Sequence, residues 1–307
     1  MTKDILIVGC GPVGRATLAL LQARGTPVRV AQRSRPANLP EGVGFTQCDV
    51  LDAAAVRAAV DGAAQIVVAI GFDYSGKAWA RMWPVAMRNL LDACAAAGAR
   101  MVFLDNLYMY GPQHAPLLET MALSNQGRKP AARAQITRMW QADRRVKVAA
   151  LRAPDFYGPG VRLSHLGDTG LAAIARGKAA IFLFSPDQPH DYAYVPDIGR
   201  AVVTLLDADD DAFGQAWHMP CAPTLSSRAI LAIGARHAGA KLRLTVIPAW
   251  LLALLAPIVS FVSEMREMHF QWDRSYKVDA SKWSQRFWSD VTPLEDGVAA
   301  TIRSFAE

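Results

Sequence analysis

The strongest constraint on the fold is a glycine-rich hexapeptide at residues 9–14 (Gly-Cys-Gly-Pro-Val-Gly), between a predicted strand and a predicted helix. Residues 5–8 (Ile-Leu-Ile-Val) have the apolar character of a buried parallel strand, and residues 15–24 have helical apolar spacing. In this context G-x-G-x-x-G predicts a dinucleotide site. Gly9 permits the tight turn, Gly11 lets the backbone approach a pyrophosphate, and Gly14 lets the helix lie close to the strand. The N–H groups at the start of the helix would receive the phosphates.

The end of the second predicted strand, residues 28–31, indicates the type of cofactor. The chain continues as Gln32-Arg33-Ser34-Arg35, with no acidic residue. An NAD site has an Asp or Glu here for the ribose hydroxyls, whereas an Arg suits a 2′-phosphate, because the guanidinium fork matches phosphate geometry. We therefore predict that NADP(H) is favoured over NAD(H), with solvated loop arginines as the alternative. Asp49 ends the next predicted strand (44–49) and is expected to face the adenine.

Strands and helices alternate along the first half of the chain. Further strands are predicted at 65–70, 101–104 and 147–151, with helices at 83–97 and within 128–144. This alternation predicts an α/β fold: a Rossmann-type, doubly wound parallel sheet with a smaller C-terminal substrate lobe. We assign residues 1–220 to an NAD(P)-binding Rossmann domain, with part of the pocket at 155–195, and residues 221–307 to a mainly helical substrate lobe.

Composition is that of a soluble globular enzyme, with 52% hydrophobic and 20% charged residues. The net charge of +6 comes from scattered Arg and Lys residues, so no nucleic-acid surface is predicted. The four cysteines have neither metal-site nor disulfide spacing. The N-terminus leads directly into a strand without a signal peptide, so we expect a cytoplasmic protein. A homodimer is the candidate assembly. The apolar segment 249–262 contains Pro257 and is short for a membrane span. It is predicted to be a buried or interface helix, with membrane contact as the disfavoured alternative.

Five later segments carry a family resemblance. They are residues 104–112 (Leu-Asp-Asn-Leu-Tyr-Met-Tyr-Gly-Pro), 151–160, 190–198, 272–279 and 292–295. Together they resemble the fifth-strand, sixth-strand, return and C-terminal motifs of extended short-chain dehydrogenases/reductases of the NAD-dependent epimerase/dehydratase type. The resemblance spans nearly the whole chain. It implies a nicotinamide cofactor and a small-molecule substrate.

The chain departs from this family at the catalytic residues. Active members carry a Ser on the fifth strand and a Tyr-x-x-x-Lys on the next helix. The corresponding positions here are Asn106, Ala131 and Gln135. The glycine loop also differs from the usual G-x-x-G-x-x-G spacing of extended members. This combination is similar to atypical members, which keep the cofactor fold and lose the triad.

Tyr108 is the best candidate for the missing proton donor, because in a strand-like segment it shares a face with Asn106. Lys129 and Arg133 would supply positive charge nearby, and the alternative is that Tyr108 only packs in the pocket. The other predicted site residues fall into two groups. For the cofactor they are Gly9, Gly11, Pro12, Val13, Gly14, Arg33, Arg35, Asp49, Ile70, Gly71, Gln135, Ala153 and Pro154. For the substrate they are Tyr74, Asp155, Tyr157 and Tyr192, and no metal site is predicted.

Three functions remain open at this point. The first is an NADP(H) oxidoreductase on a small carbonyl or alcohol, in which the cofactor carries the hydride. The second is a non-catalytic NADP(H)-binding redox sensor or regulator. The third is a nucleotide-sugar epimerase or dehydratase, disfavoured because that chemistry depends on the missing Tyr base. The first is preferred because the substrate lobe is present, although a fold alone does not decide among them.

Overall fold

The computed structural model describes residues 4–306 and separates into two units. The first comprises residues 4–109, 123–152 and 198–217, and the second comprises residues 110–122, 153–197 and 218–306. The chain therefore passes between the units several times. This division differs from the predicted one, because segment 153–197 groups with the C-terminal residues.

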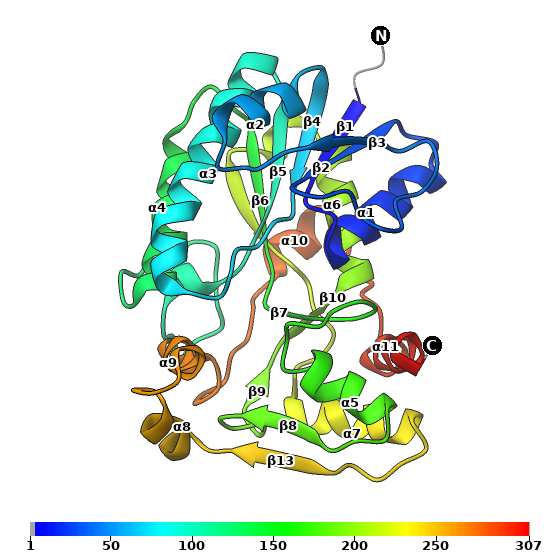
Figure 1. Ribbon diagram of the computed structural model, residues 1–307, viewed down its shortest axis with the longest axis vertical. Coiled ribbons are helices and arrows are strands. Elements are labelled where there is room, and N and C mark those ends of the chain that lie inside the picture. The colour runs from blue at the N-terminus through cyan, green and yellow to red at the C-terminus, as the bar shows by residue number, and fades with distance from the viewer. Residues whose placement is uncertain (1–3, 307) are drawn as a thin grey trace. The chain divides into compact units, whose positions relative to one another are not determined.

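A seven-stranded sheet forms the centre of the first unit, in the order β11-β6-β5-β4-β1-β2-β3 (Figure 1). The six strands from β6 to β3 pair in parallel, and their order is that of a doubly wound dinucleotide-binding sheet. This confirms the predicted fold class. The strands are β1 (Asp4–Val8), β2 (Val28–Gln32), β3 (Gly44–Gln47), β4 (Ala63–Val68), β5 (Arg100–Asp105), β6 (Val148–Arg152) and β11 (Gln215–His218).

Helices cover both faces of this sheet, with α2, α3 and α4 on one side and α1 and α6 on the other (Figure 1). The central strands are accordingly apolar throughout, and Leu6 and Ile7 have no exposed surface. Gly199 of α6 lies so close to α1 that an added Cβ would be 2.9 Å from the Cβ of Ala16. The helices are α1 (Pro12–Ala23), α2 (Ala53–Val60), α3 (Gly76–Ala97), α4 (Arg128–Ala142) and α6 (Val195–Asp207).

Helix α3 is longer than predicted. It begins at Gly76 rather than at residue 83, and the hydroxyl of Ser75 caps it by accepting a hydrogen bond from the Ala78 N–H. Pro84 lies inside the helix, and Gly98 ends it in the left-handed conformation with φ of 66°. The additional N-terminal residues, 76–82, include Trp79, which is important for the site described below.

The second unit is built from short strand pairs and helices. β7 (Asp155–Tyr157) pairs in parallel with β10 (Tyr192–Tyr194), and β8 (Ala180–Leu183) pairs in parallel with β13 (Leu244–Ile247). β9 (Pro189–His190) pairs antiparallel with β12 (Leu225–Ser226). The helices are α5 (Ala172–Ala175), α7 (Ser227–His237), α8 (Ala249–Leu255), α9 (Ser260–Glu267), α10 (Ser281–Arg286) and α11 (Leu294–Ala306).

The apolar segment 249–262 differs from its prediction. It forms two helices, α8 and α9, with Pro257 between them, rather than the single buried or interface helix that was expected. Several of its large side chains are exposed, including Trp250, Leu254, Ile258 and Phe261. Within residues 4–306, no helix has both the length and the apolar character needed to cross a membrane.

Candidate functional site

The glycine loop has the conformation that its sequence predicts. Gly9 has φ of +95°, and an added Cβ there would lie 2.6 Å from the carbonyl oxygen of Ala69. An added Cβ at Gly14 would lie 2.1 Å from the carbonyl oxygen of Gly9, so α1 packs directly on the end of β1. Gly11, in contrast, is exposed, and its added Cβ would meet nothing within 4 Å. Gly9 and Gly14 are therefore required by the fold, whereas Gly11 leaves space for a ligand.

A cavity of about 300 Å³ lies at this loop, at the carboxyl ends of β1, β2 and β4. This is where a doubly wound sheet binds its ligands, because the strand order reverses there. The cavity brings together six predicted cofactor residues from four separate segments. They are Gly9, Gly11, Arg33, Asp49, Ile70 and Gly71.

Gln32 connects the two loops that face each other across this cavity. Its side-chain carbonyl accepts a hydrogen bond of 2.9 Å from the N–H of Cys10, and its amide donates to the carbonyl of Ser34 at 2.7 Å. The glycine loop and the Arg33 loop are therefore held together by one side chain. Sequence reasoning missed Gln32, although its position at the end of β2 was the available signal.

The other predicted cofactor residues do not line the cavity. Pro12 begins α1 and Val13 is buried beneath it. Arg35 stacks over the ring of Phe45, with its guanidinium carbon 5.6 Å from the ring centroid. Gln135 is exposed on α4, and Ala153 and Pro154 are buried in the second unit. Their contact with a cofactor stays a prediction.

Tyr108 and Tyr74 are brought together by Trp79. The Tyr108 and Trp79 rings stack with centroids 5.9 Å apart, and Tyr74 meets the edge of Trp79 at 5.8 Å. The ammonium of the buried Lys129 lies 4.5 Å from the Tyr74 ring centroid. Tyr108 does not occupy a strand: β5 ends at Asp105, and Tyr108 begins a 3₁₀ turn. Its position is therefore set by this aromatic cluster rather than by strand alternation.

A buried ion cluster lies beneath these rings. Asp105 is ion-paired to Arg133 at 3.5 Å and to Arg152 at 3.6 Å, and all three side chains are nearly inaccessible. The Arg133 guanidinium lies over the Trp83 ring at 4.0 Å and near Trp79 at 5.2 Å. Burial lowers the pKa of Arg133 from its ordinary value, while Asp105 and Tyr108 act in the opposite direction. The expected positive charge therefore lies close to Tyr108.

The three residues at the family's Ser, Tyr and Lys positions differ in chemistry from that triad. The side-chain oxygen of Asn106 accepts a hydrogen bond of 3.1 Å from the N–H of Tyr108, so Asn106 shapes the turn. Ala131 is half-buried and Gln135 is exposed. None of these three side chains carries a titratable proton at neutral pH.

The predicted substrate residues of the second unit have unequal environments. Tyr157 and Tyr192 are buried, and burial raises the pKa of both phenols. Asp155 keeps 22% of its side chain exposed and is 3.0 Å from Nε2 of the buried His190. Of these three side chains, that of Asp155 is the most exposed. The substrate role of all three, and of Tyr74, stays a prediction.

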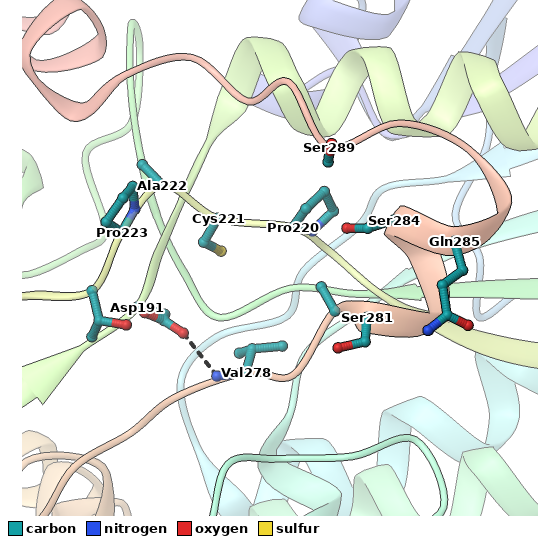
Figure 2. Close-up of a pocket in the computed structure, with 12 residues that line it drawn as sticks. Asp191, Pro220, Cys221, Ala222, Pro223, Val278, Ser281, Ser284, Gln285 and Ser289 are labelled. Atoms are coloured by element: carbon teal, nitrogen blue, oxygen red, sulfur yellow. Dashed lines mark hydrogen bonds between the residues drawn. The ribbon is translucent and has the colours of Figure 1, made fainter.

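A second cavity of about 480 Å³ lies within the second unit (Figure 2). Its walls come from the loop at 220–224, the start of α10 and the strand-end residue Asp191. The Asp191 carboxylate accepts a hydrogen bond of 2.7 Å from the N–H of Val278, as the dashed line in Figure 2 marks. Burial raises the pKa of Asp191, and the hydrogen bonds from Thr224 and Val278 oppose that effect. Sequence reasoning did not find this cavity, because its residues are far apart in the chain.

Comparison with known proteins assigns the chain to a family. Residues 5–218 match the NAD dependent epimerase/dehydratase family, so the chain belongs to that family. This confirms the resemblance drawn from the sequence motifs. No match was found among curated proteins.

Solved structures agree on the fold over the whole chain. The Bordetella bronchiseptica enzyme WbmH, in complex with NAD+, is similar with a TM-score of 0.78 and 17% identity, over 100% of this chain and 99% of that one. UDP-glucose 4-epimerase of Thermus thermophilus, in complex with NAD, has a TM-score of 0.76 and 20% identity, over 98% of both chains. UDP-glucuronic acid 4-epimerase of Bacillus cereus, in complex with UDP-glucuronic acid and NAD, has a TM-score of 0.80 and 15% identity, over 98% of both chains.

Proposed function

We propose that this protein is an NADP(H)-dependent oxidoreductase that acts on a small carbonyl or alcohol substrate. The observation that carries the proposal is the cavity at the glycine loop, which Arg33 lines together with Gly9 and Gly11. A nicotinamide cofactor suits this cavity, because Gly11 leaves room for a pyrophosphate and the helix start provides free N–H groups. When bound, the cofactor would supply or accept the hydride.

The preference for NADP(H) rests on charge at the end of β2. Arg33 lines the cavity, and no Asp or Glu follows the strand before residue 41. The similar solved structures named above contain NAD. The 2′-phosphate would distinguish the two cofactors, because it offers Arg33 a charge-assisted contact that the NAD ribose lacks.

The hydroxyl of Tyr108 is the group that we propose for contact with the substrate oxygen in the first unit. Ala131 and Gln135 have no acidic proton to donate, and Asn106 holds the turn. A phenol donates to a carbonyl oxygen as the carbonyl gains negative charge. The cationic cluster of Arg133, Arg152 and Asp105 favours such a donor.

A nucleotide-sugar epimerase or dehydratase is the second candidate, and the similar solved structures favour it. Two of those described are 4-epimerases of UDP-sugars. The same cavity would serve that function, but the usual Tyr and Lys positions hold Ala131 and Gln135. The third candidate, a redox sensor, requires cofactor binding without turnover.

One set of assays separates these functions. The purified protein is titrated calorimetrically with NADPH and NADH, and NADPH oxidation is followed with a panel of aldehydes, ketones and enones. UDP- and dTDP-sugars are tested in parallel for epimerisation or dehydration. We expect tighter NADPH binding and oxidation by at least one carbonyl. Binding without any turnover would support the sensor, and conversion of a nucleotide sugar would replace the proposal.

A further inference from the structure

Helices α8 and α9 of the second unit lie side by side and expose large apolar side chains (Figure 1). Trp250 and Leu254 of α8 are each 66% exposed, and their spacing of four residues places them on one face of the helix. Ile258 between the helices is 83% exposed, and Phe261 of α9 is exposed as well. The same segment is anchored in the core by Leu252, Ala256 and Val262. Large apolar side chains gathered in this way mark an interaction site.

The apolar surface continues onto the two-stranded sheet that precedes α8. In the parallel pairing of β8 with β13, Ile181 lies opposite Thr245 and Leu183 lies opposite Ile247. Side chains alternate between the two faces of a strand, so these four residues share one face of the sheet. Ile181 on this face is exposed. Only Pro248 separates β13 from α8, so the sheet leads directly into the exposed helix (Figure 1).

Four cationic residues lie at the opposite end of this sheet. Arg176 and Lys178 precede β8, and Lys241 and Arg243 precede β13, so the parallel pairing places all four at the same end. All four are exposed. Arg243 donates a hydrogen bond to the carbonyl of Gly177, which joins the two loops. Within residues 4–306 none of the four forms an ion pair, so their charge is available to an external anion.

No acidic residue interrupts these elements in the sequence. Asp and Glu are absent from residues 169–186, which contain β8, and from residues 238–263, which run from the loop before β13 into α9. The two strands are four residues long, so the cations lie about 13 Å along the sheet from the start of the apolar helix. The exposed apolar side chains of α8, α9 and β8, together with the four cations, are called the basic–apolar surface.

A second copy of the chain is one candidate occupant of the basic–apolar surface. In a two-fold symmetric dimer the same surface meets itself. Four cations without an acidic partner would then face like charges, which disfavours the contact. A bilayer that contains anionic lipids supplies the opposite charge and an apolar layer together. Trp side chains such as Trp250 are also enriched at membrane–water interfaces. Charge complementarity therefore favours the bilayer.

We propose that the basic–apolar surface binds an anionic phospholipid bilayer. Trp250, Leu254, Ile258 and Phe261 enter the boundary between headgroups and acyl chains, and the four cations contact the headgroup phosphates. A protein bound in this way lies on the bilayer and needs no helix that crosses it. This binding is independent of the nicotinamide cofactor and of turnover. The sequence disfavoured membrane contact because the segment is too short to span, which does not restrict binding at the surface.

Vesicle co-sedimentation tests this binding with the full chain. The protein is mixed with vesicles of phosphatidylcholine alone and with vesicles of phosphatidylcholine and phosphatidylglycerol in equal parts. We expect binding to the anionic vesicles and little binding to the neutral ones. Added salt should weaken the binding, because it screens the attraction between the cations and the phosphates. Equal binding to the two kinds of vesicle, or none to the anionic kind, would overturn the proposal.

Two double variants separate the apolar contribution from that of the charges. Trp250→Ser with Leu254→Ser should lower partitioning onto anionic vesicles by at least about tenfold, because two apolar side chains no longer leave water. Lys178→Gln with Lys241→Gln should lower it by about fivefold for each cation removed. All four side chains are exposed, so both variants should fold, and thermal unfolding verifies this.

Matched controls alter exposed residues outside the basic–apolar surface. Leu163→Ser removes a fully exposed apolar side chain of the same unit, and Arg57→Gln with Arg144→Gln removes two exposed cations of the first unit. Both controls should bind the anionic vesicles as the wild type does. Full binding by the Trp250→Ser, Leu254→Ser variant would overturn the proposal. Size-exclusion chromatography gives the remaining test: a wild-type dimer that this variant converts to a monomer would assign the surface to a second copy instead.

Discussion

The ring of Trp79 stacks on the ring of Tyr108, with centroids 5.9 Å apart and an angle of 12° between the planes. The indole N–H of Trp79 donates to the carbonyl of Asp73 at 2.9 Å, which fixes the orientation of the indole. Trp79 also contacts the Arg133 guanidinium. The position of the proposed substrate-contacting hydroxyl therefore depends on a residue of α3 that is distant in the sequence.

Tyr108→Phe should slow turnover while leaving the fold unchanged. Phenylalanine keeps the stack on Trp79 and removes only the hydroxyl, so the transition state loses one hydrogen-bond donor. The expected loss in kcat is about 10²–10³-fold. Steady-state NADPH oxidation measures it, and thermal unfolding of both proteins is the control for an unchanged fold. Equal rates in the wild type and Tyr108→Phe would show that the hydroxyl does not contact the reacting oxygen.

Arg33→Ala should weaken NADPH binding and leave NADH binding nearly unchanged. The loss of a charge-assisted phosphate contact should cost about 1.5–3 kcal/mol of NADPH binding free energy. Arg57→Ala is the matched control, since Arg57 is exposed on α2 and does not line the cavity. Calorimetric titration of the three proteins with both nucleotides gives the comparison. Equal affinity of the wild type for the two nucleotides would contradict the NADP(H) preference.

Gly11→Val should abolish nucleotide binding in a folded protein. An added Cβ at Gly11 meets nothing within 4 Å, so the side chain enters the space of the pyrophosphate without straining the chain. Gly14→Val is the contrasting variant, because its Cβ would lie 2.1 Å from the Gly9 carbonyl oxygen and should disrupt the fold. Thermal unfolding and calorimetry together distinguish the two effects. If Gly11→Val still binds the nucleotides, the glycine loop is not the phosphate-binding site.

Asp105→Asn should destabilise the protein strongly, because it leaves two buried arginines without their carboxylate. Breaking a buried ion pair in this way costs about 3–5 kcal/mol. Asp207→Asn removes an exposed pair with Arg24, and its effect should be within about 1 kcal/mol. Urea unfolding at pH 7 gives both values. If both variants lose a similar free energy of unfolding, the buried ion pairs of Asp105 do not stabilise the protein more than an exposed pair does.

His165 should make the protein less stable at mildly acidic pH. Burial lowers the pKa of His165 to about 4, below its ordinary value of 6.5, so the folded state favours the neutral ring. The resulting stability is present above about pH 6.5 and is lost as pH falls toward 4. Between pH 7 and 5 the wild type should lose about 1–2 kcal/mol more free energy of unfolding than His165→Phe. If the free energy of unfolding changes with pH equally in the two proteins, the pKa of His165 is not lowered by folding.

Sequence periodicity predicted the first unit well for a physical reason. Buried parallel strands must be apolar on both faces, and helix ends need special residues, so β1, β2 and the end of α3 at Gly98 are visible in the sequence. The cavity residues Gly9, Gly11, Arg33 and Asp49 were predicted because each follows a strand of the same sheet.

The remaining features depend on contacts that no local pattern records. Tyr108 was placed by strand alternation, but β5 ends at Asp105 and a 3₁₀ turn follows. The start of α3 was missed, and Trp79 with it. The pairing of His190 with Asp155 joins residues 35 positions apart through β7, β9 and β10, and short strands of two or three residues have no periodicity to detect.

The division of the chain also determines the order in which its parts become available during synthesis. The central sheet includes β11, which follows the long 153–197 segment of the other unit. Because synthesis proceeds from the N-terminus, the ribosome releases β1 to β6 well before β11 completes that sheet. The outer edge of β6 therefore stays unpaired in the nascent chain until about residue 218 has emerged. That interval is when the protein would most need a chaperone that shields strand edges.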